Sequence, residues 1–194
     1  MALQLTEKSV RQFIEEVSDQ HHAMAGAVIA VSAAHATALG EACMQISLDH
    51  QVDKLDWQVV TSRIEQMVHL KNTFIAWCDQ DAAAIAEYVA LRQAGQTLQG
   101  QRLLCESPAE MSRLAIEAVR VLQNFRPLVI EQVQDDLEMA LSLLAGVARA
   151  ALLLLDSNLR VWPDPALLAE FEPILTALEQ QIDQLTPVQR IRKG

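Results

Sequence analysis

The chain has 194 residues, 51% of them hydrophobic, and a formal net charge of −10. This length suits one well-buried core, so we expect a single helical domain over residues 1–194. Nucleic acids bind basic surfaces, and the basic residues cluster only at the C-terminal end, which argues against a nucleic-acid partner. The three cysteines are widely spaced, so neither a disulfide framework nor a metal site is expected. With no signal-like start, we expect a cytoplasmic protein.

Ala, Leu, Gln and Glu dominate the composition, and no run of alternating β-branched residues suggests a strand. The predicted fold class is therefore all-α, a multi-helix bundle. Thr6 is placed to cap a first helix, whose apolar stripe includes Val10 and Val17. A polar turn at His21-His22 leads to a second helix over about 23–48. Its small and apolar residues predict that it is buried and packs closely on a neighbour.

A long third helix is expected over about 55–92. Residues 93–106 contain two glycines and predict a loop or an interrupted helix. Ser107-Pro108 has the pattern of a helix start, with serine as the cap and proline at the first helical position. This fourth helix should end near Phe125, before Pro127.

The central helix is predicted from Gln134 to Asn158, and it is the most apolar part of the chain. It lacks a broad polar face, so most of its sides should be covered. It is also too often interrupted to be a convincing membrane span, and no membrane partner is expected. Asp136 and Asn158 would lie roughly 33 Å apart along it. A last helix follows over about 165–185.

Several polar residues are candidates for chemistry, and each has a structural alternative. His21-His22 could ligate a metal or transfer a proton, although a solvated turn explains the pair as well. His35 is more simply an interior histidine with a hydrogen-bond partner than a ligand. Asp81 could be a partly buried general base or part of an exposed acidic edge. Asp136 has the same two interpretations, and an acid in a first helical turn also favours the helix dipole.

In chain order, these segments resemble the methenyltetrahydrofolate cyclohydrolases and formiminotetrahydrofolate cyclodeaminases. The resemblance runs from Val10 to about Leu178. The segments that carry it are QFIEEVSDQ, ALGEACMQIS, DQDAAAIAEYVA, SPAEMSRLAIEAV and QDDLEMALSLLAGVARAALLLLDSNL. The last of these looks like the family's serine-aspartate signature followed by its long Ala/Leu helix.

The resemblance implies an all-α homodimer that opens the methenyl ring of a folate with water or eliminates ammonia from a formimino-folate. It implies no cofactor, with a tetrahydrofolate derivative as the possible substrate. Asp136 and Asp81 are the catalytic candidates. The substrate-binding candidates are His22, Gly26 and Asn158.

The chain departs from the family pattern at four places. Of the family's glycine run before the second helix, only Gly26 remains. Ala94-Gly95-Gln96 replaces a leucine-proline-lysine, Glu131-Gln132 replaces a glycine-asparagine, and Leu154 replaces the first of two late asparagines. Three functions therefore stay open: a divergent folate or pterin cyclohydrolase, an enzyme acting on another small cyclic substrate, and a non-catalytic helical dimer that binds or regulates a partner.

Overall fold

The computed structural model describes residues 5–19, 24–50, 57–188 and 190–192. These residues form helices and no strand, which confirms the all-α prediction. The elements are two short 3-10 helices, η1 (Leu5–Glu7) and η2 (Arg126–Leu128), and six α-helices: α1 (Val10–Asp19), α2 (Ala25–His50), α3 (Trp57–Gln93), α4 (Thr97–Phe125), α5 (Glu131–Val161) and α6 (Pro165–Asp183).

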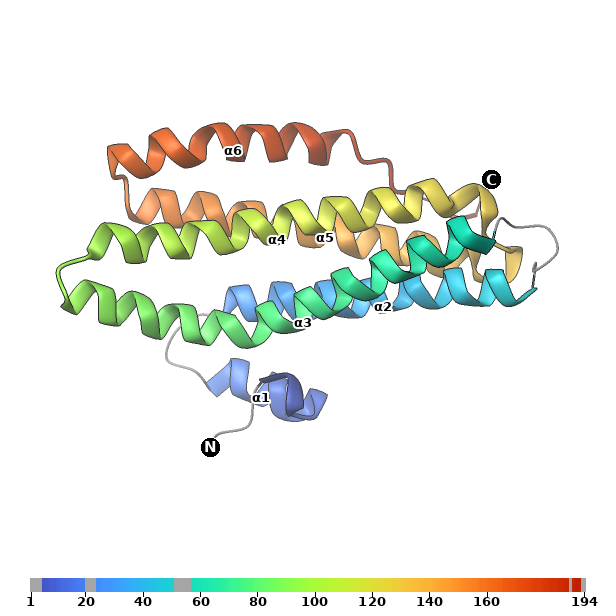
Figure 1. Ribbon diagram of the computed structural model, residues 1–194, viewed down its shortest axis with the longest axis horizontal. Coiled ribbons are helices and arrows are strands. Elements are labelled where there is room, and N and C mark those ends of the chain that lie inside the picture. The colour runs from blue at the N-terminus through green and yellow to red at the C-terminus, as the bar shows by residue number, and fades with distance from the viewer. Residues whose placement is uncertain (1–4, 20–23, 51–56, 189, 193–194) are drawn as a thin grey trace.

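Four long helices, α2 to α5, run up and down beside one another (Figure 1). Helices α2 and α4 each pack against both α3 and α5, so the four enclose a common core. Helix α6 covers the α4–α5 side, whereas α1 lies beside the bundle and has no buried residue (Figure 1). The long helices therefore separate the candidate site residues between the two ends of the bundle.

Helices α2 and α5 supply much of the core, as their small and apolar residues predict. Within the described residues, these two are also long and apolar enough to cross a membrane, which is weak evidence because core helices pass the same test; about half of each apolar window is buried in the bundle. The prediction that α5 is covered on most sides is only partly right. The side of α5 away from α2, α4 and α6 exposes large apolar residues, including Leu143 and Leu153.

The start of α1 differs from the prediction, because Ser9 rather than Thr6 caps it. The Ser9 hydroxyl accepts a hydrogen bond from the Gln12 backbone N–H at 3.3 Å, and the Gln12 side chain accepts one from the Ser9 N–H at 2.9 Å. This is a capping box, which satisfies two backbone donors reciprocally. Thr6 lies in η1 and bonds to Asp79 of α3 instead.

Helix α4 begins eleven residues earlier than predicted, at Thr97 and not at Pro108, and continues through Ser107 and Pro108. Proline has no N–H to bond to the carbonyl four residues before it, here that of Leu104. The Asn158 side-chain amide donates to this carbonyl at 2.8 Å. Because α5 supplies the missing donor, Pro108 is accommodated inside the helix and does not begin it.

A buried ion pair joins the start of α5 to the segment after α4. Glu138 is 6% exposed and accepts two hydrogen bonds from Arg126, at 2.6 and 2.9 Å. Arg126 also donates to the Thr186 carbonyl at 3.0 Å, which holds the chain after α6 against this end of the bundle. The ion pair with Arg126 therefore explains why an acidic residue, Glu138, occurs in the apolar sequence of α5.

Candidate functional site

Gly26 and Asp81 meet where the start of α2 packs against α3. A Cβ atom placed on Gly26 would lie 2.7 Å from Asp81 Cγ and would overlap its Oδ1. The carboxylate therefore occupies the space of the absent side chain, and glycine is the residue that permits this approach. The structure thus brings together one catalytic and one substrate-binding candidate.

Two further residues of α3 extend this polar region. Asp79 accepts hydrogen bonds from the Thr6 backbone N–H at 3.0 Å and from its hydroxyl at 2.6 Å, which ties η1 to α3. Cys78 is buried, and burial, with smaller contributions from Asp79 and Asp81, raises its pKa to about 11. The thiol is therefore a neutral neighbour of the two acids and a poor nucleophile.

Asp136 lies at the other end of the bundle. Its charge acts on Cys43 of α2, whose pKa is raised to about 11 first by burial and then by Asp136. Cys43 lies about 25 Å along α2 from Gly26. Asp81 and Asp136 therefore cannot contact the same small substrate within one chain.

Asn158 lies at the end of α5 opposite to Asp136, as predicted. Its amide donates to the Leu104 carbonyl, so it stabilises α4 in addition to any role toward a ligand. His22 lies outside the described residues. The substrate-binding roles assigned to Asn158, His22 and Gly26 stay predictions.

A groove of about 750 Å³ lies between the η1–α1 segment and the faces of α2 and α3. Most of its lining is apolar, from Leu5 and Phe13 on one side to Val31 and Ile75 on the other. Val28 and Cys78 also line it. Val28 lies two residues after Gly26 in α2, and Cys78 lies three residues before Asp81 in α3, but neither Gly26 nor Asp81 lines the groove.

Three basic or titratable side chains line the same groove. Lys71 is paired with Glu41 at 2.5 Å, and Lys8 is paired with Glu16. His35 is exposed to the groove and its Nδ1 lies 2.8 Å from the Val31 carbonyl. The expectation of an interior histidine is therefore wrong, because residue 35 falls on the side of α2 that faces the groove and not the core.

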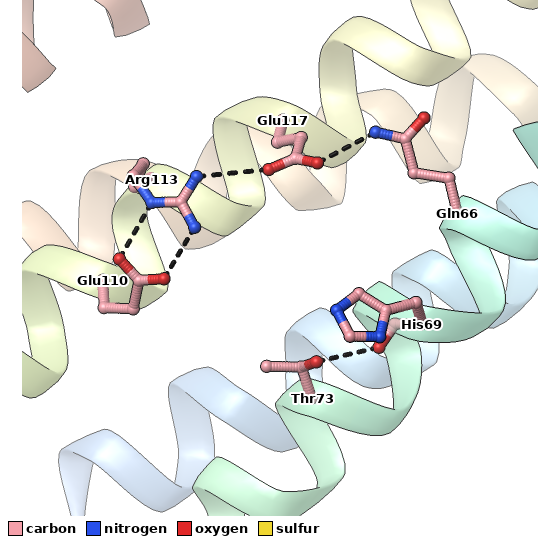
Figure 2. Close-up of polar contacts among 6 residues, drawn as sticks. All are labelled: Gln66, His69, Thr73, Glu110, Arg113 and Glu117. Atoms are coloured by element: carbon pink, nitrogen blue, oxygen red, sulfur yellow. Dashed lines mark hydrogen bonds and ion pairs between the residues drawn. The ribbon is translucent and has the colours of Figure 1, made fainter.

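A second polar cluster, not noticed in the sequence, joins α3 to α4 (Figure 2). Arg113 donates to Glu110 at 2.6 and 2.8 Å and to Glu117 at 3.3 Å, and Glu117 accepts from Gln66 of α3 at 2.9 Å. The hydrogen bond from Arg113 is the main cause that lowers the pKa of Glu110. The three- and four-residue spacing on α4 is the signal that could have revealed it. These groups are largely exposed, so we interpret the cluster as an interhelical tie.

No group of three or more potential metal ligands occurs in the described part of the chain. The chain is an all-α bundle with a largely apolar groove between α1, α2 and α3 and with a glycine–aspartate contact between α2 and α3. The formiminotransferase-cyclodeaminase family model matches residues 9–175, and the chain belongs to this family. No curated protein gives a significant match. The resemblance noted in the sequence is thus confirmed at the level of the family, and the matched range includes Asp81, Asp136 and Asn158.

Proposed function

We propose that this protein binds a reduced folate or related one-carbon pterin and opens its methenyl ring with water. Membership of the formiminotransferase-cyclodeaminase family supports a folate-related, cyclodeaminase-like role. The observation that carries the finer proposal is the placement of the Asp81 carboxylate against Gly26, between the same two helices, α2 and α3, that line the apolar groove.

In the proposed reaction, Asp81 accepts a proton from water as the water oxygen bonds to the methenyl carbon. The cyclic carbon–nitrogen bond then breaks as the added hydroxyl becomes the formyl C=O and releases its proton to solvent, while the freed nitrogen takes the proton held by Asp81. The net result is one formyl group and one proton released. The apolar walls of the groove suit the flat ring system of a pterin. Lys8 and Lys71 lie where they could exchange their glutamate partners for a substrate carboxylate.

Asp136 is the second catalytic candidate and requires a different site, because it lies at the other end of α2. This separation favours a second candidate function, a non-catalytic helical dimer that binds or regulates a partner. An enzyme that acts on another small cyclic substrate is the third. In each case we propose that the protein is a homodimer and is cytoplasmic. The large exposed apolar residues of α5 support the homodimer.

The experiment is a titration with methenyltetrahydrofolate, in which tryptophan emission follows binding and loss of the methenyl absorbance follows ring opening. Asp81→Asn should bind the folate and lose turnover. Asp79→Asn is the matched control, because it removes a neighbouring carboxylate that bonds to Thr6 and should keep turnover. Binding without turnover in the unaltered protein would support the non-catalytic function. Absence of binding would contradict the folate proposal.

A further inference from the structure

His35 lines the groove between α1, α2 and α3, and the reaction proposed above does not use it. Its side chain is exposed on α2. The Nδ1 atom lies 2.8 Å from the carbonyl oxygen of Val31, one turn earlier in the same helix. A carbonyl oxygen only accepts hydrogen bonds, so Nδ1 carries the proton of this contact. In the neutral imidazole the other ring nitrogen, Nε2, is then a hydrogen-bond acceptor.

The acceptor on His35 is available to a ligand. Within residues 5–19, 24–50, 57–188 and 190–192, no group donates to Nε2 and no acid forms an ion pair with the ring. Ser32 lies three residues earlier, also lines the groove and is exposed. Its hydroxyl donates to the Val28 carbonyl at 2.7 Å, which leaves only lone pairs on Oγ. Residues three apart are neighbours on a helix surface, so α2 presents two adjacent acceptors to the groove.

The strong donors that line the groove are already engaged. The Ser18 hydroxyl donates to a carbonyl of α1 at 3.0 Å, and the Thr6 hydroxyl donates to a carboxylate of α3 at 2.6 Å. Lys8 and Lys71 are each paired with a glutamate. Cys78 adds only a weak S–H donor. The α2 face of the groove therefore suits a ligand that supplies the hydrogen-bond donors itself.

We propose that His35 is a ligand-binding residue, whose Nε2 accepts a hydrogen bond from an N–H group on the edge of a flat ring, with Ser32 Oγ as a second acceptor. The apolar walls, including Phe13 and Ile75, would cover the faces of that ring, and a groove of about 750 Å³ suits a small molecule. A ring without N–H groups would leave Nε2 desolvated and unpaired, which is unfavourable.

This inference deepens the proposed function and rests on it, because the pterin of a folate carries N–H groups along its pyrimidine edge. It assigns that edge to α2, whereas Asp81 is the group assigned to the reacting carbon. It also gives the groove a selection rule: flat rings with N–H donors are bound in preference to flat rings of the same shape without them.

His50 shows what the bond to the backbone does without a groove. It is exposed at the end of α2, and its Nδ1 lies 2.8 Å from the Ile46 carbonyl, as in His35. It is not among the residues that line the groove. The carbonyl four residues earlier thus fixes the same tautomer in both rings, and only the groove distinguishes them. His50 is therefore the matched control.

Nitrogen NMR of histidine-labelled protein tests the acceptor directly. At about pH 8, where an ordinary histidine is neutral, His35 and His50 should both show the Nδ1–H tautomer. The variants His35→Leu and His50→Leu assign the signals. Formyltetrahydrofolate, which has no methenyl ring to open, is the first probe, and tryptophan emission follows its binding. At saturation the Nε2 signal of His35 should move to that of a hydrogen-bonded nitrogen, and that of His50 should stay.

Two smaller probes test the donor on the ligand: a methylpterin, and its N-methylated analogue in which methyl groups replace the edge N–H hydrogens. The unaltered protein should bind the methylpterin about tenfold more tightly, as expected when a hydrogen bond is lost and its partner is left unpaired. His35→Leu should remove most of this preference, and His35→Gln, which keeps an acceptor, should retain part of it. His50→Leu should leave it unchanged. Melting temperatures check that each variant folds.

The outcomes separate this inference from the proposed function. An unchanged Nε2 signal of His35 with formyltetrahydrofolate bound would overturn the role of His35 and leave the proposed function standing. The same preference for the methylpterin in His35→Leu as in the unaltered protein would also overturn it, because His35 would then only shape the groove. Binding of the methylpterin through His35 without binding of the folate would contradict the proposed function and support the acceptor. Binding of neither would contradict both.

Discussion

Asn158 compensates for a hydrogen bond that Pro108 cannot make, although the two residues lie fifty positions apart in the chain and in different helices. The proline leaves the Leu104 carbonyl without its helical donor, and the asparagine amide supplies one. Buried or half-buried carbonyl groups without a partner are costly, so the pair explains how α4 continues unbroken.

Asn158→Ala should lower the free energy of unfolding by about 1–2 kcal/mol, because the Leu104 carbonyl loses its donor. The loss should appear as a lower melting temperature. Pro108→Ala in the same chain should recover part of the loss, since alanine restores the N–H that bonds to this carbonyl. Equal stability of the single and double variants would show that the amide serves another purpose.

Gly26→Ala should destabilise the protein by about 1–3 kcal/mol, because the new methyl group overlaps the Asp81 carboxylate. Chemical denaturation measures the change. Asp81→Ala in the same chain should remove most of the penalty by making space. If Gly26→Ala alone is neutral, the two helices can separate at no cost and the contact does not position Asp81.

At the scale of the elements, α4 carries a pH-dependent contribution to stability. Arg113 lowers the pKa of Glu110 in the folded protein. A carboxyl group with a lowered pKa stabilises the fold above its unfolded pKa, and this contribution is lost as the pH falls through the folded pKa. Arg113→Met should therefore raise the pKa of Glu110 and make stability less dependent on acid pH. Carboxyl chemical shifts in an NMR titration measure the pKa directly, and an unchanged value would contradict the assignment.

The Arg126–Glu138 pair should have a larger effect, because Glu138 is buried. Arg126→Met leaves a buried carboxylate without its partner, and we expect a loss of about 3–5 kcal/mol in thermal or chemical unfolding. Changing both residues to methionine should be much less harmful than the single change, since no charge is then buried alone. Similar losses in both variants would mean that packing, rather than charge, dominates here.

At the scale of the whole molecule, the separation of Asp81 from Asp136 and the reduced glycine run both bear on activity. We expect hydrolysis of methenyltetrahydrofolate to be much slower than in a family member with the complete glycine run. Loss of the methenyl absorbance measures the rate in both proteins. Equal rates would show that the missing glycines are dispensable.

Helix content and the approximate bounds of α2, α3, α5 and α6 followed from the sequence, because helix propensity and apolar spacing act over a few residues. The errors have local causes as well. Thr6 and Ser9 both fit a helix start, and only the reciprocal bonds to Gln12 distinguish them. Ser107-Pro108 has a typical start pattern, which tertiary packing overrides.

For the candidate site, the resemblance of the sequence to a family indicated the candidates Asp81, Asp136, Gly26 and Asn158. The length of the predicted central helix alone determined that Asp136 and Asn158 lie far apart. Only the tertiary structure decided that Gly26 meets Asp81, that Asn158 serves the carbonyl freed by Pro108, and that one side of α5 stays uncovered. The physical reason is that these contacts join residues distant in the chain. Such contacts depend on how the helices pack, whereas the propensities that form each helix depend only on its own residues.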